Sequence, residues 1–115
     1  MTLDAEAMAR LLEITGGDQA FVDELVDTFV DDARTQIEGL RAAAASGDTE
    51  AVVRPAHSLK SNAQNVGATL LAELSRSLEA DARAGAIPDL TARIDAVEME
   101  FGAVSAALRA DRTRD

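Results

Sequence analysis

Apolar residues recur at spacings of three and four in five stretches of the chain, which is the pattern of amphipathic helices. The stretches cover about residues 4–14, 18–46, 48–65 and 88–110, and the fourth lies between Gly67 and Gly85. The pattern therefore predicts five helices. The clearest stripes are Val22, Leu25, Val26, Phe29, Ala33, Ile37 and Leu40 in the second stretch, and Leu90, Ile94, Val97, Phe101, Val104 and Leu108 in the last.

Glycine, aspartate and proline mark the ends of these stretches. Asp18 and Asp48 can cap the helices that follow them, and Pro88 suits the first turn of the last helix. Pro55 falls inside the third stretch, where proline removes a hydrogen bond and kinks the axis. We expect a kinked continuous helix there; the alternative is that the helix restarts at Pro55, with His57 in its first turn.

Short connections between successive amphipathic helices favour antiparallel neighbours. We therefore expect an all-α fold, an up-down-up-down four-helix bundle with the short first helix capping one end. A chain of 115 residues suffices for one such domain. We place this domain at residues 1–110, followed by a charged tail, residues 111–115, that frays.

Composition narrows the range of partners. The net charge of −10 makes nucleic acid and an anionic membrane surface poor partners, because phosphate neutralisation needs clustered lysine and arginine. No stretch approaches the ~20 apolar residues of a membrane-spanning helix, and the N-terminus does not resemble a signal peptide. The chain has no cysteine, so disulfides and thiolate metal sites are excluded. We expect a cytoplasmic protein.

The third stretch contains the only histidine of the chain, His57. It follows Ala56 of the core seam and is turned about 100° from it on a helix, so it flanks the core. Its neighbours on the helix surface are Lys60, Ser61 and Gln64. The seam itself consists of Val52, Ala56, Leu59, Ala63 and Val66.

A lone surface histidine is usually only a polar residue, and we considered other kinds of site. A metal site lacks a second histidine and the Glu-x-x-His pair of di-iron bundles. A nucleophilic triad built on Ser58 or Ser61 would have no oxyanion hole on a helix surface. Gly16 and Gly17 are too few for a phosphate-binding loop. We therefore expect no metal site.

The segment around His57 resembles the signature of histidine-containing phosphotransfer (Hpt) domains. The matching residues are His57-Ser58-Leu59-Lys60, then Ala63, then Gly67-Ala68. The family's fold, a four-helix bundle with a capping helix, agrees with the fold expected from the pattern, and the resemblance covers essentially the whole chain. Many members carry glycine where this chain has Ser61, and serine could donate a hydrogen bond to a phosphoryl oxygen.

The resemblance implies a phosphorelay. His57 would take a phosphoryl group through Nε2 from an aspartate of a receiver domain of a hybrid sensor histidine kinase, and pass it to a response regulator. Glu79 would accept a hydrogen bond from Nδ1, Lys60 would screen the phosphoryl charge, and Gln64 could bond a phosphoryl oxygen. The protein would be a phosphocarrier without catalytic activity or cofactor, with Mg²⁺ in the partner receiver.

The resemblance also implies a docking surface and a monomer. Basic residues around His57 would suit the acidic pocket of a receiver, and apolar residues of the first helix would contact it. The expected docking residues are Arg54, Arg76, Arg83, Met8, Leu11, Leu12 and Gly67.

Three alternatives stay open. A non-transferring adaptor of the same fold could bind and modulate a kinase or receiver, although the presence of both His57 and Lys60 argues against it. A purely structural helical bundle is the second, and a continuous exposed heptad seam would indicate it. The phospho-accepting domain of a chemotaxis kinase is the third, but such a chain should continue into kinase domains.

Overall fold

The computed structural model of this chain consists of helices joined by short turns, with no strand among the residues that it describes. It describes residue 3, residues 5–14 and residues 16–112, without the side chains of residues 5, 7, 8, 11, 111 and 112. None of these helices is long and apolar enough to cross a membrane. The elements are α1 (Ala5–Ile14), α2 (Gln19–Ser46), the 3₁₀ turn η1 (Glu50–Val52), α3 (Val53–Asn65), α4 (Thr69–Ala84) and α5 (Leu90–Arg112).

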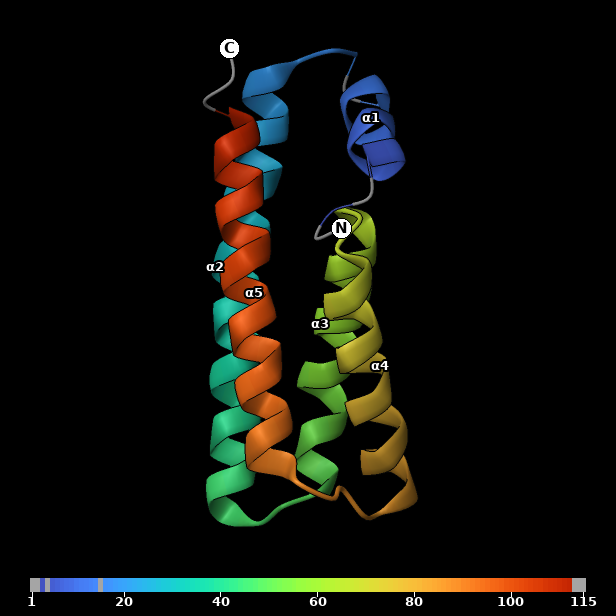
Figure 1. Ribbon diagram of the computed structural model, residues 1–115, viewed down its shortest axis with the longest axis vertical. Coiled ribbons are helices and arrows are strands. Elements are labelled where there is room, and N and C mark those ends of the chain that lie inside the picture. Colours follow the sequence, from blue (N-terminus) through green and yellow to red (C-terminus); the bar gives the residue numbers. More distant parts are fainter. Residues whose placement is uncertain (1–2, 4, 15, 113–115) are drawn as a thin grey trace.

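Helices α2 to α5 form an antiparallel four-helix bundle (Figure 1). Each of the four packs against two others, in the closed order α2, α3, α4, α5 and back to α2. The α2 and α5 helices are longer than α3 and α4, and α1 lies over the end of the bundle where α3 ends and α4 begins (Figure 1). The predicted fold class is confirmed.

The predicted apolar stripes form the core. All five seam residues of the third stretch are buried, and so are the stripes of α2 and α5 except Leu25 and Leu90, which are half-buried. The rings of Phe29 and Phe101 pack with their centroids 6.4 Å apart and join α2 to α5. The largest fully buried side chains are Leu40, Leu59, Leu71, Leu78, Ile94 and Leu108.

The kinked continuous α-helix expected at Pro55 is not found, and the new α-helix begins two residues earlier than the alternative placed it, at Val53. The chain enters α3 through the 3₁₀ turn η1, and the Asp48 carboxylate accepts a hydrogen bond from the Ala51 N–H at 3.2 Å. Pro55 is the third residue of α3, where a backbone N–H has no partner within the helix. The proline therefore costs no hydrogen bond within α3, and His57 lies beyond the first turn.

Pro88 also lies outside the helix that it was expected to begin. Asp89 has a positive φ of 54°, which is incompatible with a right-handed helix, so α5 starts at Leu90. The Asp89 carbonyl accepts the hydrogen bond of the Arg93 N–H at 2.9 Å, and the Arg93 side chain bonds to Asp81 of α4 at 2.8 Å. At the other end α5 runs to Arg112, so residues 111 and 112 of the expected tail are helical; residues 113–115 lie outside the described residues.

Replacing Ser105 by alanine is expected to stabilise the fold. Ser105 is 6% exposed, and its hydroxyl has no hydrogen-bond partner in the described part of the chain. A buried unsatisfied polar group is destabilising, so Ser105→Ala should raise the free energy of unfolding by about 1 kcal/mol. Urea denaturation measures this. As a control, Ser77→Ala removes an exposed hydroxyl that accepts a hydrogen bond from Arg93, and should give no gain. A loss of stability in Ser105→Ala would contradict the prediction.

Candidate functional site

His57 lies on the flank of α3, beside the core. Its neighbours Ala56 and Leu59 are completely buried, whereas the His57 side chain is 54% exposed. The packed seam therefore fixes the backbone under the imidazole and leaves the ring open to an incoming molecule. This is the flanking position that the helical spacing predicts.

Glu79 of α4 lies against the imidazole. Its Oε2 atom is 3.0 Å from Nδ1 of His57, and its side chain is only 9% exposed. Because an ionised carboxylate can only accept hydrogen bonds, Nδ1 carries the proton and donates it. The lone pair of the neutral ring then lies on Nε2, the atom expected to act as nucleophile. The predicted contact between Glu79 and Nδ1 is present.

Two cations hold Glu79 in place. Lys60 Nζ is 3.0 Å from Oε1, and Arg83 Nη2 is 2.8 Å from Oε2. Burial alone would raise the pKa of Glu79, but the hydrogen bonds from Arg83, Lys60 and His57 and the Lys60 charge lower this pKa to about 2. The carboxylate beside His57 is therefore ionised at all physiological pH values.

This ion-pair cluster is the part of the site that the sequence analysis missed. Lys60 was expected to face the phosphoryl group, yet in this structure its ammonium contacts Glu79, and its side chain is 23% exposed. Arg83 was expected to contact a partner, and it also binds Glu79. The four-residue spacing of Glu79 and Arg83 on one helix was a signal that could have indicated this pair.

The remaining residues expected near His57 are spread over its surroundings. Arg54 is exposed and lines, with Arg83, a hollow between η1, the start of α3 and the end of α4. Ser61 is half-buried. Arg76 is paired with Glu73 on α4, at 2.7 Å, so it is held by a neighbour of its own helix. Of the three expected arginines, the structure brings Arg54 and Arg83 to one hollow.

Gly67 is buried rather than part of an exposed surface. Its φ of 72° lies in the left-handed region, and its N–H donates to the Gln64 carbonyl at 3.2 Å. Glycine adopts this conformation readily, so Gly67 ends α3 and turns the chain into α4. Its place in the signature is explained by this turn.

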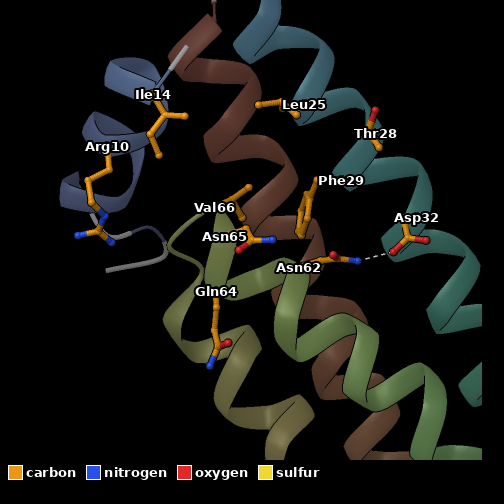
Figure 2. A pocket seen from close by; sticks show the side chains of 10 residues that line it. All are labelled: Arg10, Ile14, Leu25, Thr28, Phe29, Asp32, Asn62, Gln64, Asn65 and Val66. Atoms are coloured by element: carbon orange, nitrogen blue, oxygen red, sulfur yellow. Dashed lines mark hydrogen bonds between the residues drawn. The ribbon is translucent and has the colours of Figure 1, made fainter. Parts of the chain in front are cut away.

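A second hollow lies between α1, α2 and the end of α3 (Figure 2). Leu25, Phe29 and Val66 are its apolar residues on the bundle side, and Ile14 faces it from α1. Among its polar residues, the amide of Asn62 donates to the Asp32 carboxylate and ties α3 to α2. The other lining residues are Arg10, Thr28, Gln64 and Asn65.

Of the apolar docking residues expected on α1, the structure describes one side chain. Leu12 is 38% exposed. The side chains of Met8 and Leu11 lie outside the described residues. In the same described part of the chain, no three histidine, cysteine, aspartate or glutamate side chains are grouped as metal ligands would be.

Fold and site together define a class of protein. An oriented imidazole stands on the outer surface of a helical bundle, where a partner can reach it, and this is the arrangement of a histidine phosphocarrier. The chain belongs to the Hpt domain family, whose sequence model matches residues 24–107. It is thus a histidine phosphotransfer protein of phosphorelay signalling, and the partners of such domains are receiver domains.

A solved structure agrees with this assignment. The chain is similar to the crystal structure of histidine-containing phosphotransfer protein B (HptB) from Pseudomonas aeruginosa PAO1, with 35% sequence identity and a TM-score of 0.90. The match covers 99% of this chain and 96% of the other. No curated protein sequence matched the chain.

The ion pairs of Glu79 make the fold sensitive to acid. Since the pKa of Glu79 falls from 4.5 to about 2 on folding, its stabilisation is complete above pH 4.5 and is lost as the pH falls toward 2. The shift corresponds to at most about 3 kcal/mol, and screening at Arg83, which is 61% exposed, reduces this. Urea denaturation should show the stability difference between wild type and Glu79→Gln shrinking over this pH window. A difference that stays constant would contradict the prediction.

Proposed function

We propose that His57 is the phosphorylated residue, accepting the phosphoryl group from an aspartate of one receiver domain and passing it to another. The observation that carries this proposal is the 3.0 Å contact between Nδ1 and the buried Glu79 carboxylate, on a ring that is 54% exposed. The contact fixes one tautomer, and the exposure leaves Nε2 accessible to a docked partner.

In the accepting step, the Nε2 lone pair attacks the phosphorus of the aspartyl phosphate. The bond between phosphorus and the aspartate oxygen breaks, and the aspartate leaves as a carboxylate. The ring keeps its Nδ1 proton and gains positive charge, which Glu79 stabilises through a charge-assisted hydrogen bond. In the donating step a second aspartate attacks the phosphorus, and the N–P bond electrons return to Nε2.

The cations around His57 would then serve the phosphoryl group. Lys60 and Arg83 hold Glu79 before transfer, and because they share this carboxylate with the ring, their charges would offset part of the charge of a phosphoryl dianion. Arg54 adds a third cation at the neighbouring hollow. Ser61 and Gln64 are proposed to bond phosphoryl oxygens. The Mg²⁺ of the reaction belongs to the acidic pocket of the receiver.

The proposed partners are the receiver domains of a hybrid sensor histidine kinase and of a response regulator. Docking would use Leu12 and the hollow between α1, α2 and the end of α3, whose apolar residues are Ile14, Leu25, Phe29 and Val66. A relay protein must release its partner quickly, so we expect a small interface and a monomeric chain. The chain is proposed to act as a phosphocarrier without independent catalytic activity.

The test mixes the purified chain with a panel of receiver domains that their kinases have radiolabelled on aspartate. We expect label on the chain that is stable in base and labile in acid, and a fragment mass that locates it on His57. Subsequent addition of an unlabelled receiver should remove the label. A chain that binds receivers and never acquires label would overturn the carrier function and favour the adaptor.

A further inference from the structure

Glu79 presents a charge to His57 as well as a hydrogen-bond acceptor, and these two properties have different consequences. We propose that the negative charge of Glu79 keeps the Nδ1 proton on the phosphorylated ring, and that it thereby favours residence of the phosphoryl group on His57. This inference rests on the proposed function and deepens it. It makes Glu79 a positioning residue that also sets the phosphotransfer equilibrium.

The charge of the ring changes when it is phosphorylated. Neutral imidazole uses its only lone pair to bond phosphorus, so the product ring carries a proton on Nδ1 and a formal positive charge. If that proton leaves, the ring becomes neutral, and its Nδ1 no longer donates to Glu79. The fate of one proton therefore decides whether the contact with Glu79 survives phosphorylation.

The geometry favours retention of the proton. The Oε2 atom of Glu79 is 3.0 Å from Nδ1, and an opposite charge at this distance favours the charged form of a group. The carboxylate is 9% exposed, so water screens the interaction little. If the Nδ1 proton were lost, the buried Glu79 carboxylate would accept one hydrogen bond fewer.

Other charged groups reach this part of the molecule from each element packed against α3. Lys60 and Arg54 lie on α3 itself, and Arg83 lies on α4. These cations oppose a positive ring, but Lys60 and Arg83 are paired with Glu79. On η1 Glu50 lines the hollow beside Arg54, and on α2 Asp32 is bonded to Asn62. Among the described residues, Glu79 is the anion with a hydrogen bond to the ring.

Retention of the proton has two effects on transfer. It stabilises the phosphorylated ring relative to the aspartyl phosphate, which draws the phosphoryl group onto His57. It also lets the ring leave as neutral imidazole when the next aspartate attacks, whereas a deprotonated ring would have to leave as the much more basic imidazolate. The carrier therefore holds the group and stays able to donate it.

The experiment exploits the single histidine of the chain. The full chain, with ¹⁵N-labelled histidine, is phosphorylated chemically with phosphoramidate, and NMR follows the Nδ1 signal of phosphorylated His57 as the pH rises. The variant Glu79→Gln keeps an oxygen acceptor and removes the charge. Glu73→Gln is the matched control, since it removes the charge of an exposed glutamate of α4 that is bonded to Arg76.

We expect Glu79→Gln to lose the Nδ1 proton at a pH about 1–2 units lower than wild type. The phosphotransfer equilibrium with a receiver should move toward the receiver by about tenfold for each unit of that shift. Glu73→Gln should leave both unchanged. Should Glu79→Gln fail to fold, Glu79→Ala provides the same comparison, and Glu79→Asp should recover part of the wild-type behaviour in either case.

The outcomes separate the two proposals. The inference would be overturned if phosphorylated His57 lost its Nδ1 proton at the same pH in wild type and in Glu79→Gln. It would also be overturned if Glu73→Gln shifted this pH as much as Glu79→Gln does. Either result would leave the proposed function intact. Phosphorylated His57 that titrates as expected and exchanges with no receiver would overturn the proposed function alone. A titration shift without movement of the transfer equilibrium would refute the second half of the inference.

Discussion

His57→Gln is expected to abolish phosphoryl transfer to this chain, leaving label at the background of the assay. The nucleophile is removed, and no other histidine is present to replace it. Glutamine retains a polar side chain of similar length, but its amide nitrogen is not nucleophilic. Because the His57 side chain is 54% exposed, the substitution should leave the bundle folded.

The measurement is transfer of label from a phosphorylated receiver, with circular dichroism to verify the fold. Met99→Gln serves as the matched control, since it introduces the same side chain on α5 at a position that is 80% exposed. This control should accept label at the wild-type level. Acid-labile label persisting on a folded His57→Gln chain would show that another residue carries the group.

Leu59→Ala is expected to cause the largest loss of stability of the changes considered. Leu59 is completely buried in the α3 seam, two residues after His57. Truncation of a buried leucine removes apolar contact and leaves a cavity, which destabilises a domain by about 2–5 kcal/mol. The free energy of unfolding of a native protein is only about 5–15 kcal/mol, so this substitution should remove much of the stability.

Denaturation by urea, followed by circular dichroism, measures this loss. Leu70→Ala makes the same chemical change at a position that is 51% exposed, and should alter stability by no more than about 0.5 kcal/mol. Comparable losses in the two variants would show that the α3 seam is not packed as described. The comparison thus tests the placement of α3 independently of phosphotransfer.

The sequence predicts the bundle well because its evidence is periodic and repeated. The seam of the third stretch, from Val52 in η1 to Val66 after α3, is buried throughout, as the spacing of its apolar residues indicates. The two prolines show where such reasoning fails. The chain before Pro55 forms a 3₁₀ turn, and Asp89 takes a positive φ that starts α5 after Pro88; the apolar period indicates neither.

Part of the site was also predictable from the sequence. The helical period places His57 on the flank of the core, and the family resemblance pointed to Glu79 as the acceptor for Nδ1. The ion pair of Lys60 with Glu79 depends on the register between α3 and α4, which spacing along one helix does not contain, whereas the pair of Glu79 with Arg83 lies within α4. Contacts between helices were therefore the part that needed the structure.

The His57 imidazole lies on α3 and the Glu79 carboxylate lies on α4, and this limits how far the chain can be truncated. A peptide of α3 alone would keep His57 and lose the carboxylate that fixes its tautomer. The oriented ring needs both α3 and α4, which are joined through the turn at Gly67 and pack against the rest of the bundle. Transplanting the activity to another helical scaffold would accordingly require two facing helices in the correct register, with the signature segment on one and the acid with its arginine on the other.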